Sequence, residues 1–263
     1  MIQENVSLKP FNTFGVEASA RYVSEVNSIE ELIETLRQAQ CDTLKFSNSQ
    51  TCHPELVEGL PLLFIGGGSN ILLTKDFEGL AIQLDLKGIS EEIIDDNTVL
   101  VTAKAGENWH QFVMFCLDKN YGGLENLSLI PGNVGTSPMQ NIGAYGTEIK
   151  DIFESCKVLN LETLEIEVFN LEKCRFGYRD SIFKQEGKGK YVILEVTFRL
   201  TRTDHKIDVE YGAIKSELEN LGITNPTIKD VSKAVINIRQ SKLPDPKVIA
   251  VSYTHLTLPT IYS

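Results

Sequence analysis

The sequence lacks the features of disulfide-rich, zinc-binding and membrane-spanning proteins. Its five cysteines are odd in number and include no C-x-x-C pair, which favours free thiols over a disulfide framework or a metal site. They are Cys41, Cys52, Cys116, Cys156 and Cys174. No stretch approaches the ~20 apolar residues that cross a bilayer, and residues 1–7 contain no basic start followed by an apolar run. We therefore expect a cytoplasmic protein without a metal.

Positive charge is also scarce. The 263 residues include 36 acidic and 25 basic side chains, which gives a net charge of -11. Such a surface is unsuited to neutralising phosphate backbones or anionic lipid, so we expect neither nucleic acid nor a membrane as a partner. With 42% hydrophobic residues, the chain is long enough for one large domain or two modest ones.

Hydrophobic periodicity predicts a mixed α+β fold in which strands outnumber helices. Ser28 and Glu31 form a capping box at the start of the first expected helix. Helices are expected at 28–38, 108–120, 213–221 and 229–239. Strands are expected at 20–26, 61–65, 71–74, 80–84, 98–105, 157–161, 165–169 and 191–200. The helix at 108–120 has one apolar face, made of Trp109, Phe112, Val113, Cys116 and Leu117.

Two segments differ from the rest. Residues 41–59 interrupt the short connection expected between a helix and the strand at 61–65, and we interpret them as an inserted surface excursion, with an ordinary family-specific loop as the alternative. Residues 249–263 follow LPDPKV abruptly, and VSYTHLTLPTIYS resembles a translated sequencing adapter. We interpret this tail as non-native and expect no functional residue in it.

A glycine run, Gly66-Gly67-Gly68-Ser69-Asn70, directly follows the apolar strand expected at 61–65. Glycines let backbone N–H groups turn inward as a nest for phosphate oxygens. The run lacks the third glycine and the following helix of the dinucleotide fingerprint, and also the Lys-Ser/Thr pair of a P-loop. It is interpreted as a phosphate cradle or, alternatively, as a glycine-rich turn between strands.

Residues 130–146 have neither helical nor strand periodicity, yet they are not especially polar. Small residues in this stretch allow close approach to a flat ligand, and Tyr145 supplies a ring for stacking or capping. Hydrogen-bonding groups are expected from Thr136, Ser137, Gln140 and Asn141. The alternative is a long, well-packed surface loop.

Residues 174–184, CRFGYRDSIFK, are dense in groups that bind anions or move protons. Arg179 is suited to holding a carboxylate through two parallel hydrogen bonds. The alternative is a salt bridge between Arg179 and Asp180 or another acid, and Asp180 is equally suited to capping a strand or helix.

Together the three segments resemble the UDP-N-acetylenolpyruvoylglucosamine reductase family of peptidoglycan precursor synthesis. The resemblance begins at Asn12-Thr13-Phe14-Gly15 and continues through AGENWHQFV, Tyr211-Gly212 and KLPDPK at 242–247. Apart from the insert, it covers nearly the whole chain up to Val248. Each motif alone would be a hypothesis, but their common order makes coincidence a poor explanation.

The resemblance implies an FAD-binding fold of the vanillyl-alcohol-oxidase (PCMH) type. Residues 1–203 are then expected to form an FAD-binding region of two α+β subdomains, and residues 204–248 the start of a substrate-binding domain. The implied reaction is the NADPH-dependent, FAD-mediated reduction of UDP-N-acetylglucosamine enolpyruvate to UDP-N-acetylmuramate, by a protein we expect to be monomeric.

The resemblance also assigns roles to individual residues. The FAD pyrophosphate would lie at Gly66, Gly67, Gly68, Ser69 and Asn70, and further flavin contacts would come from Thr136, Met139, Gly143 and Tyr145. Arg179 would be catalytic, stabilising the negative charge that develops at C2 and its carboxylate during reduction. Substrate or nicotinamide would contact Tyr178, Tyr211 and Lys242.

The sequence departs from the family after LPDPKV. A GNAGSFFKNP-like segment with a proton-donating serine is expected there, followed later by a glutamate partner for the arginine, and neither is present. We therefore expect a C-terminally truncated member that binds FAD but lacks its proton donor. We also expect the helix at 229–239 to expose Val231, Val235 and Ile238, which would otherwise meet the missing domain or the sheet. A non-catalytic FAD-binding fragment and another flavin oxidoreductase of the same superfamily remain the alternatives.

Overall fold

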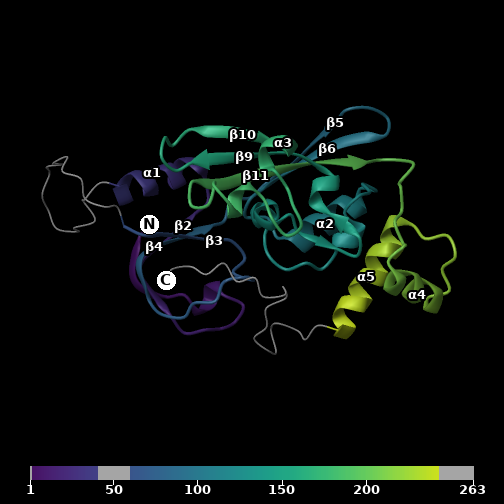
Figure 1. Cartoon of the computed structure of the whole chain (residues 1–263), viewed down its shortest axis with the longest axis horizontal. Coiled ribbons are helices and arrows are strands. Elements are labelled where there is room, and N and C mark those ends of the chain that lie inside the picture. The colour runs from purple at the N-terminus through teal and green to yellow at the C-terminus, as the bar shows by residue number, and fades with distance from the viewer. Residues whose placement is uncertain (1, 41–59, 243–263) are drawn as a thin grey trace, which may run out of the picture.

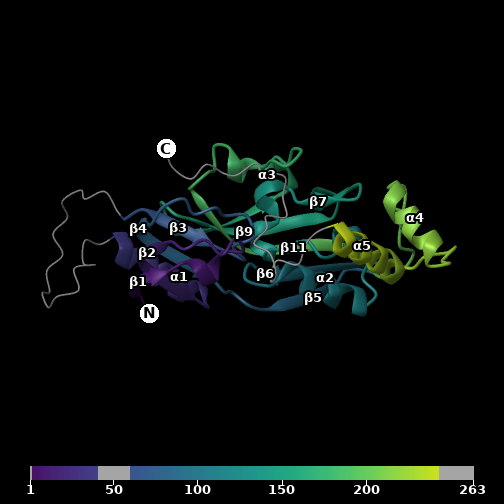
Figure 2. The same cartoon turned by 90° about the horizontal axis from the view of Figure 1, so that it is seen from below.

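The computed structural model describes residues 2–40 and 60–242, so the predicted insert at 41–59 and the tail at 249–263 lie outside the described residues. Two β-sheets follow one another along the long axis of the molecule, and a pair of helices stands at the far end from the N-terminus (Figure 1). The same arrangement seen from below separates the N-terminal sheet clearly from that helical pair (Figure 2).

The first sheet has four strands in the order β1-β2-β4-β3. Their bounds are β1 (Gln3–Ser7), β2 (Ser19–Val26), β4 (Phe77–Leu84) and β3 (Leu62–Ile65). β1 is antiparallel to β2, whereas β2 and β3 both run parallel to β4. Helix α1 (Ile29–Gln40) buries Leu32 and Leu36. The Ser28 half of the predicted capping box is confirmed, because Glu31 N donates to Ser28 Oγ (3.1 Å). The Glu31 carboxylate reaches back one residue further than expected and accepts from Asn27 N (2.9 Å).

The second sheet has five antiparallel strands in the order β10-β9-β11-β6-β5. Their bounds are β10 (Ile166–Asn170), β9 (Phe153–Asn160), β11 (Tyr191–Thr201), β6 (Thr98–Lys104) and β5 (Ile89–Ile93). Helix α2 (Trp109–Asp118) packs in the core of this sheet and buries all five residues of its predicted apolar face. Between β10 and β11 lies the one-turn helix α3 (Leu171–Cys174).

The C-terminal helices α4 (Gly212–Asn220) and α5 (Ile228–Lys242) pack against each other. The expectation that α5 exposes an apolar face is wrong: Val231, Val235 and Ile238 are buried, together with Ile214 and Leu218 of α4. Helix α4 covers the face that sequence reasoning left for a missing domain or the sheet.

Two further differences concern strands. Residues 71–74 do not form the expected strand, although Ile71 and Leu73 pack against the core of the first sheet. Their apolar run therefore reflects partial burial without a hydrogen-bonded partner strand. Strands β1 and β5 were not predicted, because their side chains are largely exposed and carry no apolar period.

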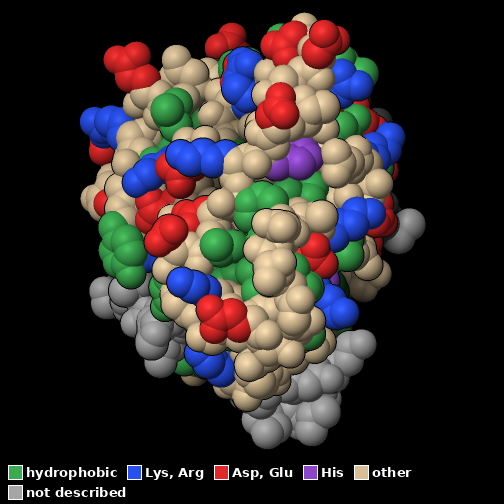
Figure 3. Space-filling model, turned by 90° about the vertical axis from the view of Figure 1, so that its right-hand side faces the viewer, with side chains coloured by type: hydrophobic (Ala, Val, Ile, Leu, Met, Phe, Trp, Pro, Cys, Tyr) green, Lys and Arg blue, Asp and Glu red, His purple; other side chains and the backbone are tan. Residues whose placement is uncertain are grey.

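The described cysteines behave as expected. Cys116, Cys156 and Cys174 are buried free thiols, whereas Cys41 and Cys52 lie outside the described residues. Burial raises the pKa of the Cys116 thiol far above its ordinary range, so this thiol is unreactive. On the face that carries the α4–α5 end, charges of both signs are interspersed around apolar side chains (Figure 3). Neither acidic nor basic side chains dominate this face.

Candidate functional site

The glycine run at 66–70 forms the turn that leaves β3, and it lies against the N-terminal Phe11–Thr13 segment. Gly68 has φ +63°, and a Cβ there would lie well inside contact distance of the Phe11 carbonyl oxygen. Thr13 N donates to the Gly68 carbonyl (3.1 Å). Only glycine combines this backbone conformation with so close an approach. The NTFG motif and the glycine run thus build one structure.

The glycine run is also in direct contact with the start of the 130–146 loop. A Cβ on Gly66 would lie 2.8 Å from Thr136 Cγ2, and one on Gly67 would lie 2.9 Å from Asn133 Oδ1. From the other side, a Cβ on Gly132 would lie 3.1 Å from Ser69 Oγ. The two segments therefore share one side of the molecule, as the flavin hypothesis requires.

Backbone hydrogen bonds to residues 105–109 hold the 130–146 loop in place. Trp109 N donates to Gly132 O (3.0 Å), Val134 N to Glu107 O (2.8 Å), and Gly135 N to Ala105 O (3.0 Å). The loop therefore needs no periodic pattern of its own, because the segment leading into α2 supplies its partners.

Three consecutive N–H groups of the glycine run have no hydrogen-bond partner in the described part of the chain. Among the described residues, none of the hydrogen bonds uses the N–H of Gly67, Gly68 or Ser69 as its donor. Nearby, Gln83 Nε2 on β4 donates to Gly66 O (3.0 Å), while Gln83 Oε1 is buried and has no hydrogen-bond partner in the described part of the chain. Successive backbone N–H groups without protein partners are suited to binding phosphate oxygens.

Tyr145 lies at the tip of a small hairpin made of β7 (Gly143–Ala144) and β8 (Thr147–Glu148). Tyr145 has φ 50° and Gly146 has φ 84°, so both loop residues are left-handed, as a type I′ turn requires. Tyrosine is an unfavourable residue in this conformation, so the surrounding contacts must hold it there.

Arg179 lies at the tip of a second tight turn, which is closed by an isolated antiparallel β-bridge between Gly177 and Asp180. Its guanidinium Nη2 donates to Gly143 O (2.5 Å), two residues before Tyr145. The ion-pair alternative is wrong for the described residues: Asp180 accepts instead from Ser181 N (2.9 Å) and Gln185 Nε2 (2.7 Å), and no ion pair there includes Arg179.

Buried polar side chains fasten the Arg179 turn to the 130–146 loop. Asn141, fully buried, donates through Nδ2 to Gly177 O (2.9 Å) and to the Glu148 carboxylate (3.0 Å). Ser181 Oγ donates to Met139 O (2.7 Å). Asn141 and Ser137 were expected to face a ligand, but both are buried and bonded to protein, Ser137 Oγ through Val134 O (2.7 Å). Their role is to hold the loop in shape.

Tyr211, the residue before α4, brings the C-terminal helices to the site. Its ring contacts the Tyr145 ring edge-to-face, with centroids 5.3 Å apart and planes at 90°. Burial raises the pKa of the Tyr145 hydroxyl, and the positive charge of Arg239 partly offsets the rise. Arg239 Nε also donates to Leu129 O (3.1 Å), so α5 reaches the same cluster.

The remaining predicted residues are less enclosed. Thr136 and Met139 are exposed, with Met139 at 37%, which leaves them accessible to a ligand. Tyr178 is 85% exposed, and its ring lies 5.9 Å from the Arg179 guanidinium carbon. Lys242 ends α5, three residues after Arg239, and is exposed. No described contact joins Tyr178 or Lys242 to the Tyr145–Tyr211 pair.

Sequence reasoning missed Gln83 and Asn126. Gln83 interrupts an otherwise apolar strand, and a polar residue at such a position is a signal for a buried hydrogen bond. Asn126, which is 3% exposed, lies outside all the segments in which site residues were expected. Its partners are far away in sequence, so no local pattern could reveal them.

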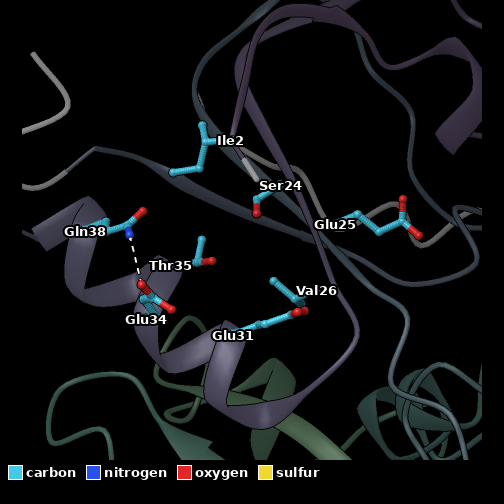
Figure 4. A pocket seen from close by; sticks show the side chains of 8 residues that line it. All are labelled: Ile2, Ser24, Glu25, Val26, Glu31, Glu34, Thr35 and Gln38. Atoms are coloured by element: carbon cyan, nitrogen blue, oxygen red, sulfur yellow. Dashed lines mark hydrogen bonds between the residues drawn. The ribbon is translucent and has the colours of Figure 1, made fainter. Parts of the chain in front are cut away.

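A cavity of about 260 Å³ lies between β2 and α1 (Figure 4). None of its lining residues belongs to the three site segments; they are Ile2, Ser24, Glu25, Val26, Glu31, Glu34, Thr35 and Gln38. Glu31 already caps α1, and Glu34 accepts from Gln38 Nε2 (3.5 Å). Three carboxylates make this cavity unsuitable for a pyrophosphate.

The described residues form neither a metal site nor a membrane-spanning helix. No group of three or more His, Cys, Asp or Glu side chains there is placed to hold a metal ion. Within the same ranges, no helix has the length and apolarity to cross a bilayer.

Known proteins resemble this chain in sequence and in structure. Residues 52–165 match the family model described as FAD binding domain. The UDP-N-acetylenolpyruvoylglucosamine reductases of Flavobacterium johnsoniae and Pseudomonas fluorescens are 52% and 48% identical to it, over 95% and 94% of this chain and 69% and 68% of theirs.

Solved structures give the same fold. The UDP-N-acetylenolpyruvylglucosamine reductase of Thermus caldophilus aligns with a TM-score of 0.56 at 20% identity, covering 93% of this chain and 97% of that one. A solvent-stable cholesterol oxidase aligns with a TM-score of 0.51 at 14% identity, covering 75% and 37%. These two similarities concern the FAD-binding fold alone. With the 52% identity over most of its length, the chain belongs to the UDP-N-acetylenolpyruvoylglucosamine reductase family.

Proposed function

We propose that this chain binds FAD, with the pyrophosphate against the glycine run at 66–70 and the flavin against the 130–146 loop. The observation that carries the proposal is the direct contact between these segments, at Gly66, Gly67 and Gly132. The free N–H groups of Gly67, Gly68 and Ser69 fit a pyrophosphate, because each can donate to an anionic oxygen. Asn70 completes the same turn.

Thr136, Met139, Gly143 and Tyr145 are proposed to contact the flavin. Thr136 and Met139 are accessible, and Tyr145 is presented at a hairpin tip. Gly143 is buried against Glu148, and a Cβ there would lie 2.8 Å from Glu148 Cγ. Its contact with the flavin would therefore come from the backbone. Bound FAD would supply the hydride chemistry, with NADPH as its reductant.

Arg179 is proposed to stabilise the negative charge that develops on the enolpyruvyl carboxylate of UDP-N-acetylglucosamine enolpyruvate. One guanidinium nitrogen is tied to Gly143 O, which fixes the plane of the group. The remaining N–H donors can then face a carboxylate in a fixed geometry. Tyr178, Tyr211 and Lys242 are proposed to contact substrate or nicotinamide. Tyr211 is already placed beside Tyr145 for this role.

The proposal assigns cofactor binding and substrate binding to different parts of the chain. Residues 1–203 would form the FAD-binding region, and residues 204–248 would begin the substrate-binding region. The sequence contains no GNAGSFFKNP-like segment, so a polypeptide of this sequence would bind FAD without reducing the enolpyruvyl substrate at a useful rate. A positioned proton donor contributes about 10² to 10⁴ in rate.

Turnover measurements test this division. NADPH oxidation is followed with FAD and UDP-N-acetylglucosamine enolpyruvate, for the 263-residue chain and for a version extended with a GNAGSFFKNP-containing C-terminal domain. We expect turnover from the extended protein alone. Equal turnover by both would show that the added segments are dispensable.

A further inference from the structure

The short helix η3 (Glu125–Leu127) forms a rigid platform beside the proposed site. All three of its residues are buried. Trp109 Nε1 donates to Leu127 O (2.9 Å), which ties the platform to α2. The hydroxyls of Ser128 and Ser232 share a buried hydrogen bond (2.7 Å), which ties the adjoining residue to α5. A side chain that projects from this platform therefore has a fixed origin.

Asn126 projects from the platform and uses one amide group to hold two separate segments. Its Nδ2 donates to Tyr145 O (3.0 Å) and to Asp208 O (3.1 Å). The first carbonyl belongs to the turn that presents the Tyr145 ring. The second lies three residues before Tyr211, in the connection from β11 to α4. Both rings of the edge-to-face pair are thus tethered to the same side chain.

Neither tethered segment holds its own conformation through regular structure. Tyr145 is in the left-handed region, which is unfavourable for a tyrosine. Residues 205–210 belong to no helix or strand. The Asn126 amide satisfies two carbonyls that would otherwise be free to turn, and its low exposure of 3% keeps water from replacing it.

We propose that Asn126 is a positioning residue for the Tyr145–Tyr211 pair and that it sets how the two rings face the flavin and the substrate. The assignment of that pair rests on the proposed function. Asn126 itself contacts neither ligand; it acts through the two backbone carbonyls. Replacing its amide should change the rings while leaving the platform in place.

Two variants and one control test this. Asn126→Leu keeps the size and removes both donors. Asn126→Asp keeps the shape, and a buried acid in its neutral form retains one donor. The control is Asn97→Ala, because Asn97 Oδ1 accepts from Thr203 N (3.1 Å) and Oγ1 (3.0 Å) in the same connection, away from the rings.

The first readout needs no ligand. The full chain is labelled with 3-fluorotyrosine, and the resonances of Tyr145 and Tyr211 are identified with Tyr145→Phe and Tyr211→Phe. We expect both resonances to move in Asn126→Leu and to stay in place in Asn97→Ala. Unchanged resonances in a folded Asn126→Leu protein would overturn the proposal. If that variant fails to fold, Asn126→Asp decides: it keeps at most one of the two donors, so at least one resonance should move, and two unchanged resonances would overturn the proposal.

The second readout is FAD affinity from flavin fluorescence. We expect Asn126→Leu to weaken it about tenfold and Asn97→Ala to leave it within about twofold. Unchanged affinity in a variant whose resonances move would overturn the claim that ring position serves the cofactor. Failure of the unaltered chain to bind FAD would instead refute the proposed function. The fluorine spectra would still test whether the Asn126 hydrogen bonds position the two rings.

Discussion

Gly68 and Gly15 provide a matched pair for testing the glycine cradle. Both have left-handed backbone conformations, with φ +63° and +61°. A Cβ on Gly15 would meet nothing within 4 Å, whereas one on Gly68 would collide with the Phe11 carbonyl. Substituting each by alanine therefore imposes the same backbone cost, and only Gly68→Ala adds a collision with backbone that cannot rotate away.

The expected magnitudes follow from these two terms. Alanine in the left-handed region costs about 1 kcal/mol, so Gly15→Ala should lower the free energy of unfolding by about that amount. Overpacking adds about 1 to 3 kcal/mol, so Gly68→Ala should lose roughly 2 to 4 kcal/mol. It should also weaken FAD binding by more than about tenfold, since the turn that presents the N–H groups must shift.

Urea unfolding measures the difference directly. Trp109 is the single tryptophan and is 1% exposed, so its emission reports loss of the second-sheet core. Midpoints are compared for the two variants and the unaltered chain at equal slope. Equal destabilisation by Gly68→Ala and Gly15→Ala would refute the close approach of Phe11 to the glycine run.

Three further predictions concern other parts of the molecule. Arg179→Lys keeps the positive charge but loses the planar guanidinium. FAD affinity should stay within about twofold, whereas the extended protein should bind UDP-N-acetylglucosamine enolpyruvate more than about tenfold more weakly in a titration. Equal substrate affinity would contradict the carboxylate role. Ser28→Ala should cost about 1 kcal/mol of unfolding free energy by removing the α1 cap, and an unchanged urea midpoint would count against it. Burial raises the pKa of Glu125 above its ordinary value of 4.5, so the folded state binds the proton more tightly, and the associated stability is present below pH 4.5 and lost as pH rises through the raised pKa. Glu125→Gln should flatten that loss in urea midpoints measured from pH 4 to pH 8, and an unchanged pH slope would show that this carboxyl is not its source.

Local patterns in the sequence predicted the elements with strong apolar faces. The five buried residues of α2 follow from spacing alone, because one helical face must leave water. The Ser28 cap of α1 likewise follows from the residue type at the helix start. The same reasoning failed at residues 71–74, where burial occurs without a partner strand. It also failed for α5, whose apolar face meets α4 instead of an absent domain.

The segments of the site were predictable from the sequence, but the hydrogen bonds between them were not. Family resemblance pointed to the glycine run, the 130–146 loop and Arg179. It could not show that Asn141 faces inward to hold the Arg179 turn, or that Arg179 bonds to Gly143 rather than to Asp180. These bonds join residues 36 positions apart in the chain, and only the three-dimensional packing of the two turns selects them.

Titration of the purified 263-residue chain with FAD, beside Gly67→Ala and Gly212→Ala, tests the central claim most directly. A Cβ on Gly67 would lie 2.9 Å from Asn133 Oδ1 and Gly132 Cα, whereas one on Gly212 meets nothing within 4 Å. We predict one FAD per chain, affinity more than about tenfold weaker in Gly67→Ala, and no change in Gly212→Ala. A folded chain that binds no FAD, or that binds it equally well in both variants, would contradict the assignment of the cofactor to this cradle.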